Sequence, residues 1–330
     1  MKAVLIQNDE RKSLVWSDVP DPVAKADEVV IKVAYAALNR ADLMQRAGDY
    51  PPPPGCPEWM GLEVSGEIVA MGDAAAAAGR FAIGDKVCAL LGGGGYAEYV
   101  AVPHGMCMHV PKNTSMIEAA AIPEAFATAY LNMFIEGGIK AGNTLLVTAG
   151  GSGLASVIIP MAKAFGIRVI TTVRSDEKAA AIAHLGADLV VNTKKQKLSE
   201  VLREELAAGR PVDVAIDCVG GEDMGECLRY LSHGARWIMI AALGGIHADL
   251  DLKNVYVRNV RVIGSTLRSR TPEMKAEILG RLVSDVWELV ESGKLRPTIF
   301  RVLPVTEAEE AHALLANSES VGKVVLEIDG

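Results

Sequence analysis

The sequence predicts an α/β protein in which a doubly wound parallel sheet follows a mainly β region, and three features of the chain support this fold class. Residues 145–174 read as an apolar run, a glycine-rich turn, a helical stretch and a second apolar run. Further apolar runs alternate with helical segments as far as residue 264. Residues 1–122 instead read as short strands separated by turns.

The first part of the chain has the pattern of a mainly β domain. Residues 51–54 are four prolines that predict a stiff extended loop, and 92–95 are glycines that predict a flexible turn. The alanine run at 74–78 is expected to be a low-complexity loop. The predicted strands are 29–33, 64–70, 86–91 and 96–102.

From residue 123 the pattern becomes that of a doubly wound sheet. Its predicted strands are 145–147, 168–173, 189–192, 212–218, 237–243 and 261–264. A helix over 272–292, a strand at 298–303, a short helix from Glu307 and a strand at 322–328 are expected to follow. The sequence thus predicts a first domain at 1–122, a nucleotide-binding domain at 123–264, and a segment at 265–330 that returns to the first domain.

The segment LLVTAGGSGLASVIIPMAKAFGIRVITTVR at 145–174 predicts a dinucleotide-binding βαβ unit. Gly150, Gly151 and Gly153 allow a tight turn and a close approach to a pyrophosphate at the start of the helix. Ala155 suits close packing of helix on strand, and Pro160 is expected to kink or shorten the helix. The alternative interpretation is a buried βαβ unit that binds no ligand.

Composition excludes several function classes. The 330 residues carry a net charge of -8 and no basic stretch interleaved with aromatic residues, which argues against nucleic-acid binding. No segment reaches the roughly twenty apolar residues of a membrane span, and the first residues do not resemble a signal peptide. Five dispersed cysteines without CxxC spacing predict reduced thiols. We therefore expect a cytoplasmic enzyme that binds neither membrane nor nucleic acid.

The end of the second strand of the βαβ unit bears on the choice of nicotinamide cofactor. Enzymes that select NAD usually carry Asp or Glu there, whereas this chain has Arg174, with Ser175 and Lys178 nearby. These donors suit a 2′-phosphate and predict NADPH. Alternatively, Arg174 and Lys178 are solvated charges and Ser175 caps a helix. The two acidic residues after Ser175 leave weaker use of NADH open.

Several stretches together resemble one known family. They are LNRADLMQRAGDYPPPPG (38–55), GLEVSGEI (61–68), IPEAFATAY (122–130), LRSR (267–270) and VGKVVLE (321–327). They resemble the zinc-independent quinone oxidoreductase branch of the medium-chain dehydrogenase/reductase superfamily, which includes zeta-crystallin, and especially its tumour-suppressor-inducible subgroup. The resemblance spans nearly the whole chain. It implies a GroES-like mainly β catalytic domain built from both chain ends, a Rossmann domain between them, and a cofactor cleft where they meet.

The resemblance also bears on zinc. Alcohol-dehydrogenase members of the superfamily hold zinc with Cys, His and a third protein ligand. In this chain Asn39 matches the Cys and Leu62 the His of the family's GHE motif, and the cysteine-rich structural lobe is missing. Because neither side chain replaces a strong zinc donor, we expect an enzyme without zinc.

Positions that match the family's motifs imply the cofactor contacts. Asn39 and Thr128 are expected near the nicotinamide ribose, and Lys323 either completes the site or forms a structural ion pair. Cys218 is expected to contact the nucleotide through its backbone rather than its thiol. The other expected cofactor-binding residues are Gly150, Ser152, Gly153, Leu154, Arg174, Ser175, Lys178, Asn192, Val219, Gly220, Ala241, Ala242, Leu243 and Leu267.

Three residues are candidates for catalysis. Tyr50 offers a hydroxyl that orients or protonates a bound oxygen, or else packs on the neighbouring prolines. Asn39 and Asp42 are expected to orient the nicotinamide or relay a proton, although Asp42 is also suited to capping a helix. Glu63 is expected to be a structural charge. The edge strand near 261–265 is expected to pair with its copy in a homodimer.

The absence of zinc ligands favours particular acceptors. A quinone that accepts hydride becomes a stabilised anion that solvent can protonate, whereas an ordinary ketone becomes an alkoxide that needs a metal or general acid. We therefore expect an NADPH-dependent quinone oxidoreductase. The alternatives are an NADPH-dependent reductase of activated alkenes (2-alkenals, enones or enoyl thioesters) and a non-enzymatic NADPH-binding sensor or structural protein.

Overall fold

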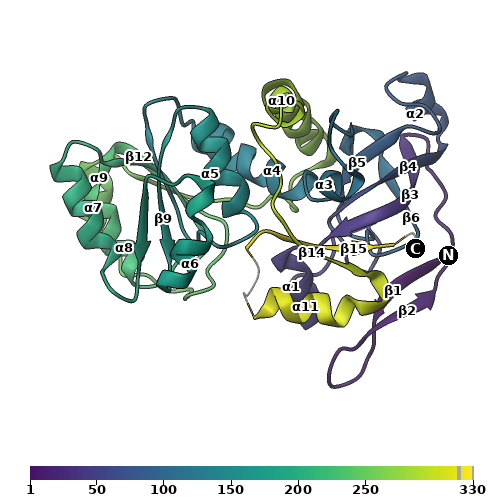
Figure 1. Cartoon of the computed structure of the whole chain (residues 1–330), viewed down its shortest axis with the longest axis horizontal. Helices are drawn as coiled ribbons and strands as arrows, with labels where there is room; N and C mark the ends of the chain where they lie inside the picture. The colour runs from purple at the N-terminus through teal and green to yellow at the C-terminus, as the bar shows by residue number, and fades with distance from the viewer. Residues whose placement is uncertain (318–320, 329–330) are drawn as a thin grey trace. The chain divides into compact units, whose positions relative to one another are not determined.

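The chain forms two units (Figure 1). A computed structural model describes residues 1–317 and 321–328. The first unit contains Met1–Ala127 and Arg268–Gly330, and the second contains Thr128–Leu267. The boundaries therefore lie a few residues after the predicted ones at 122 and 264, and the last segment belongs to the first unit.

The described part of the first unit is built on a seven-stranded sheet in the order β14-β15-β3-β4-β5-β7, with β6 paired to β3. Strand β15 pairs antiparallel with β3, so the end of the chain completes a sheet begun near its start. A separate hairpin contains β1 (Lys2–Ile6) and β2 (Leu14–Asp18). The strands of the main sheet are β3 (Glu28–Ala37), β4 (Glu63–Met71), β5 (Lys86–Leu90), β6 (Tyr99–Pro103), β7 (Cys107–His109), β14 (Ile299–Pro304) and β15 (Lys323–Glu327).

The sequence analysis gave no helix range within residues 1–122, whereas the structure contains several helices there. The alanine run predicted as a loop at 74–78 instead forms α2 (Asp73–Ala77). Alanine has the highest helix propensity, and Ala75 is buried while its N–H donates to the carbonyl of Ala26. The other helices are α1 (Arg40–Ala47), η1 (His104–Met106), α3 (Met116–Ala120), α10 (Pro272–Glu291), η5 (Val305–Glu307) and α11 (Ala308–Ala316), and α4 (Pro123–Tyr130) crosses into the second unit.

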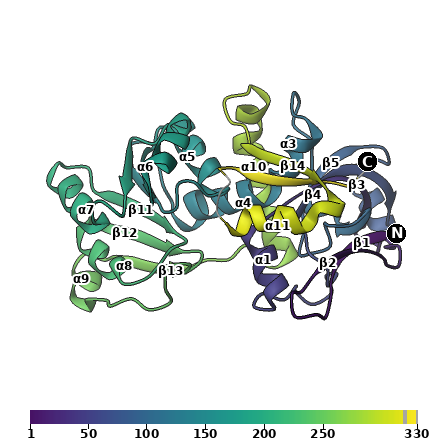
Figure 2. The ribbon, with the colours of Figure 1, turned by 60° about the horizontal axis from the view of Figure 1, so that its bottom comes forward.

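The second unit contains the predicted doubly wound sheet. Six parallel strands lie in the order β10-β9-β8-β11-β12-β13, so the strand order reverses beside β8. Helices α5 and α6 cover one face and α7 and α8 the other (Figures 1 and 2). The strands are β8 (Thr144–Val147), β9 (Arg168–Val173), β10 (Leu189–Asn192), β11 (Val212–Asp217), β12 (Leu231–Met239) and β13 (Arg261–Gly264). The helices are η2 (Leu131–Glu136), α5 (Ala155–Ala164), α6 (Asp176–Ala181), η3 (Ala183–Leu185), α7 (Leu198–Ala207), α8 (Asp223–Cys227), η4 (Leu228–Tyr230) and α9 (Leu252–Val257).

The limits of β12 and α5 bear on two local predictions. The strand predicted at 237–243 was wrong in both limits, because β12 begins at Leu231 and ends at Met239. Beyond it, the N–H of Leu243 donates to the carbonyl of Cys218 at 3.1 Å, so this apolar stretch forms a loop. Helix α5 includes Pro160, so the proline does not end it.

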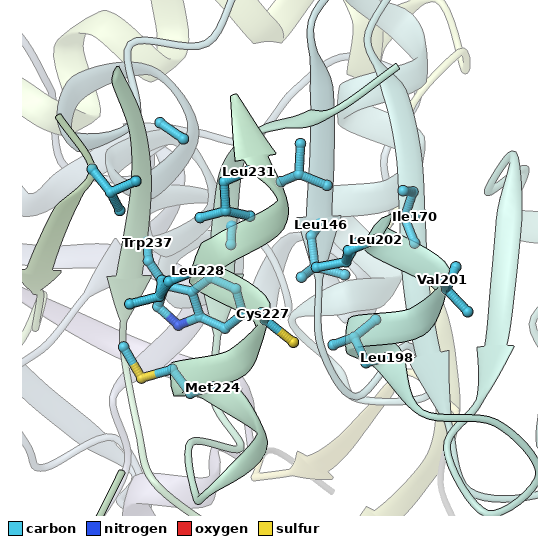
Figure 3. Packing of buried hydrophobic residues seen from close by; sticks show 14 of the residues in the cluster. Leu146, Ile170, Leu198, Val201, Leu202, Met224, Cys227, Leu228, Leu231 and Trp237 are labelled. Carbon is cyan, nitrogen blue, oxygen red and sulfur yellow. The ribbon is translucent and has the colours of Figure 1, made fainter. Parts of the chain in front are cut away.

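A buried cluster fixes the β11 and β12 region of this sheet (Figure 3). Leu198, Val201 and Leu202 recur at helical spacing on α7 and face the strands. Trp237 of β12 is 1% exposed and packs in the same cluster. This core holds in place the strand ends from which the nucleotide-site candidates project. Among the described residues, no helix has the length and apolar character needed to cross a membrane.

Candidate functional site

The glycine-rich turn after β8 approaches β9 closely. A Cβ at Gly150 would lie 2.5 Å from Oγ1 of Thr171, so only glycine fits there. The residue in the left-handed conformation is Ala149, at φ 55°, rather than one of the predicted glycines. The prediction that a glycine adopts the turn conformation was therefore wrong, because Ala149 adopts it. Gly150 is needed instead for its close packing against Thr171.

The start of α5 offers N–H groups for an anion. In the part of the chain that the structure describes, the N–H groups of Gly151, Gly153 and Leu154 donate to no other residue. The hydroxyl of Ser152 accepts from the N–H of Ala155, the first residue of α5, at 3.1 Å. Unpaired N–H groups at a helix N-terminus favour a bound phosphate.

Two cations lie where β9 ends. Arg174 is exposed, and a Cβ at Gly151 would lie 3.9 Å from Nζ of Lys178, so this ammonium borders the glycine-rich turn. Ser175 caps α6 by accepting from the N–H of Lys178 at 3.2 Å, as the alternative interpretation stated. Contact of these residues with a nucleotide stays a prediction.

The acidic residue after Ser175 is already paired. The carboxylate of Asp176 accepts from Nδ2 of Asn192 at 2.9 Å and forms an ion pair with Lys195. These interactions lower the pKa of Asp176, with the Lys195 hydrogen bond as the largest cause. The Asp176 carboxylate is thus neutralised locally, and Asn192 is engaged in holding it.

The loops after β11 and β12 are joined by backbone hydrogen bonds. The N–H groups of Leu243 and Gly244 donate to the carbonyls of Cys218 and Val219, at 3.1 and 2.7 Å. The structure thereby brings together two predicted cofactor-binding stretches, 218–220 and 241–243. Two further predicted residues lie elsewhere in this unit, Thr128 on α4 and the buried Leu267 at its end.

Asp217 organises these loops, and the sequence analysis missed it. Its carboxylate is 1% exposed and accepts from Oγ1 of Thr148, the N–H of Val219 and Nε1 of Trp237, at 2.9, 2.8 and 3.1 Å. The N–H of Gly220 donates to it as well. One buried carboxylate therefore ties together the ends of three strands. An acidic residue at the end of an apolar strand was the available signal.

In the first unit, Asn39 belongs to a buried polar network. Nζ of Lys323 lies 2.5 Å from Oε1 of Glu63 and donates to Oδ1 of Asn39 at 2.7 Å. Nδ2 of Asn39 donates to the same Glu63 carboxylate at 3.0 Å. Glu63 and Lys323 are 0% and 4% exposed. The ion pair that the sequence left as an alternative for Lys323 is present, and it orients the Asn39 amide.

Asp42 caps α1 from within the core. Its fully buried carboxylate accepts from the N–H of Asn39 at 2.7 Å, from the N–H of Gly61 and from the hydroxyl of Tyr96. Burial raises the pKa of Asp42 to about 6. The capping alternative is thus observed, and a proton relay through Asp42 stays a prediction.

Tyr50 stacks on a cation that the sequence analysis did not select. The guanidinium carbon of Arg268 lies 4.8 Å from the centre of the half-buried Tyr50 ring. Arg268 lies in the LRSR stretch that contributed to the resemblance, and no local pattern pointed to its role. Tyr50 and Arg268 are 218 residues apart in sequence, so only the fold brings them together.

Comparison with known proteins gives consistent matches along the chain. Residues 25–112 match the model of the alcohol dehydrogenase GroES-like domain, and 153–284 match that of the zinc-binding dehydrogenase. The chain is 28% identical to quinone oxidoreductase of Mus musculus over 313 residues, which cover 94% of this chain and 92% of that protein. It also resembles the solved structure of an NAD-dependent alcohol dehydrogenase, with a TM-score of 0.84, 31% identity and 99% and 100% of the two chains covered. It resembles the quinone oxidoreductase from Thermus thermophilus, solved alone and with NADPH, with a TM-score of 0.82 and 30% identity. The match covers 99% of this chain and 100% of that chain.

Proposed function

The chain belongs to the medium-chain dehydrogenase/reductase superfamily, and on this basis we propose that it transfers a hydride from NADPH to a quinone without zinc. The main support lies at the carboxyl ends of β8 and β9. There the N–H groups of Gly151, Gly153 and Leu154, which have no partner among the described residues, are accompanied by the cations Arg174 and Lys178. The similarity to quinone oxidoreductases supports the choice of acceptor.

NADPH supplies the hydride when it is bound, and this chain's residues bind and orient it. The N–H groups of Gly151, Gly153 and Leu154 are suited to its pyrophosphate. Arg174 and Lys178 are suited to its 2′-phosphate. NADH lacks that phosphate, so the same site uses it less well. The relatives differ on this point, because one solved structure is NAD-dependent and the other was solved with NADPH.

The residues of the first unit do not fit a catalytic zinc ion. The buried Leu62 offers only carbon at the position of the family's histidine, and Oδ1 of Asn39 already accepts from the Lys323 ammonium. Across residues 1–317 and 321–328, no group of three or more His, Cys, Asp or Glu side chains is arranged to hold a metal. A quinone suits such a site, because its reduced anion needs no metal to stabilise it.

An assay of the purified protein after dialysis against EDTA tests the proposal. We expect NADPH to be oxidised faster with ortho- and para-quinones than with a 2-alkenal, and faster than NADH. Turnover of the alkenal alone would assign the protein to ene reduction. Tight NADPH binding without turnover of any acceptor would favour a sensor or structural role, and activity that EDTA abolishes and zinc restores would contradict the metal-free mechanism.

We propose further that the protein is a homodimer joined through β13. This strand lies at the edge of the six-stranded sheet and exposes 43% of Val262. Nearby in the sequence, α9 exposes 67% of Tyr256 and 56% of Val257. An unpaired strand edge with exposed apolar side chains favours pairing with a second copy. Light scattering should give twice the 34.9 kDa chain mass, and Val262→Lys should shift it to the monomer. A monomeric wild type at micromolar concentration would refute the dimer.

A further inference from the structure

Arg268 is a buried cation that holds three separate segments of the first unit. It is 5% exposed, and its Nη2 donates to Oε1 of Gln45 at 2.6 Å. Nε and Nη2 donate to the carbonyl of Gly92 at 3.1 and 2.9 Å, and Nη1 donates to the carbonyl of Tyr50 at 3.1 Å. The guanidinium thus fixes the end of α1, the start of the proline loop and the glycine turn at 92–95.

These hydrogen bonds leave the positive charge available to Tyr50. The acceptors are two backbone carbonyls and the amide of Gln45, so none of them carries a countercharge. The same guanidinium lies over the face of the Tyr50 ring. A desolvated cation over an aromatic face is attracted to the ring, and here it is also bonded to that residue's backbone.

The Tyr50 hydroxyl has no partner in the part of the chain that the structure describes. Among residues 1–317 and 321–328, none forms a hydrogen bond with it. The other titratable groups that act on Tyr50 or Arg268 are Glu124, Cys56 and Asp42, and Lys275 donates to the carbonyl of Arg268 at 2.7 Å. A phenol held on both its backbone and its ring, with a free hydroxyl, is suited to meet a bound molecule.

We propose that Arg268 is a positioning residue that fixes Tyr50 and strengthens its hydroxyl as the proton donor to the oxygen of the acceptor. This inference rests on the proposed reductase function. The hydride carries two electrons to the quinone, whose oxygen becomes an anion. The Tyr50 O–H bond then breaks, its proton joins that oxygen, and the guanidinium stabilises the phenolate that remains. Water returns a proton to Tyr50, so the cycle consumes NADPH, one proton and the quinone and releases NADP⁺ and the hydroquinone.

The electrostatics give this role a pH signature. Burial raises the pKa of Tyr50, and Glu124 adds to the rise, whereas the Arg268 charge opposes it. A general acid must be protonated, so activity falls as the pH rises through the pKa of the phenol. Removing the Arg268 charge raises the pKa of Tyr50 further. The loss of activity in the pH–rate profile therefore moves to higher pH, and the rate at lower pH falls because the phenol is a weaker acid.

A double-mutant cycle between Arg268→Met and Tyr50→Phe tests the proposal. General acid catalysis contributes about 10²–10⁴-fold, so we expect Tyr50→Phe to lower kcat about 100-fold and Arg268→Met about tenfold. The KM for NADPH should stay within about twofold, since the predicted nucleotide contacts lie mainly in the other unit. On the Tyr50→Phe background, Arg268→Met should cost less than about threefold, because the arginine acts through the tyrosine. Arg268→Lys should recover most of the rate, and Arg281→Met, at an exposed arginine of α10, is the matched control.

The phenol pKa provides a readout that does not depend on turnover. Titration of ¹³C-labelled tyrosine by NMR, with Tyr50→Phe to assign the signal, should show a higher Tyr50 pKa in Arg268→Met than in the wild type. An unchanged Tyr50 pKa, or equal losses of kcat for Arg268→Met on both backgrounds, would overturn the proposal and leave Arg268 a structural residue. If the wild type turns over no acceptor, the proposed function fails, and the NMR titration still decides whether Arg268 tunes Tyr50.

Discussion

Lys323→Met is expected to lower the free energy of unfolding by about 3–5 kcal/mol, because it leaves the buried carboxylate of Glu63 without its cation. Glu63 is 0% exposed, so water cannot replace the lost partner without opening the sheet. The two remaining donors, Nδ2 of Asn39 and the N–H of Glu124, are neutral and compensate only in part. Urea-induced unfolding at pH 7, followed by far-UV circular dichroism, measures the change.

Two control variants separate the ion pair from a general loss of charge. Lys294→Met removes an exposed lysine from the turn after α10 and should change stability by less than about 0.5 kcal/mol. Adding Glu63→Gln to Lys323→Met should recover part of the loss, since the buried charge is then gone. If the free energy of unfolding of Lys323→Met alone stays within about 1 kcal/mol of the wild-type value, Glu63 has found another partner. That result would contradict the argument that Glu63 is left as an uncompensated buried charge.

The fold could be predicted from the sequence because its signals are local. The apolar runs at 145–147 and 168–173 and the intervening glycines lie within one βαβ unit, and the structure contains β8, α5 and β9 there. Local composition misled where contacts decide the outcome. The alanine run became helix α2 once Ala75 was buried, and the apolar stretch after Met239 left the sheet because its backbone bonds to the β11 loop.

The polar networks of the candidate site could not be predicted in the same way. Glu63 and Lys323 lie 260 positions apart and meet because β15 pairs with β3 next to β4. Sequence reasoning left an ion pair and a cofactor contact open for Lys323, since no local pattern distinguishes them. Arg268 reaches Tyr50 by the same kind of long-range return. Residue types indicated which groups carry chemistry, whereas tertiary pairing determines what each group does.

Exchanging both Arg174 and Lys178 for alanine is expected to lower kcat/KM for NADPH about 100-fold, since each charge-assisted phosphate contact is worth roughly one factor of ten. The value for NADH should stay within about threefold, because that cofactor has no 2′-phosphate to lose. The neighbouring carboxylate of Asp176 is already paired with Asn192 and Lys195, so it does not by itself favour the ribose hydroxyls of NADH. Steady-state kinetics with each cofactor at saturating quinone measures the ratio.

A general electrostatic effect would give a different pattern. Lys194 is exposed beside the same strand ends, and its backbone N–H donates to Oδ1 of Asn192. Lys194→Ala removes a nearby positive charge without removing either proposed phosphate ligand, so it should change kcat/KM for NADPH by less than about threefold. Screening by salt weakens long-range attraction but spares a direct contact, so raising the ionic strength should reduce the effect of Lys194→Ala before that of the double variant. If the double variant loses kcat/KM equally for NADPH and NADH, Arg174 and Lys178 do not bind the 2′-phosphate. Other residues would then determine the choice of cofactor.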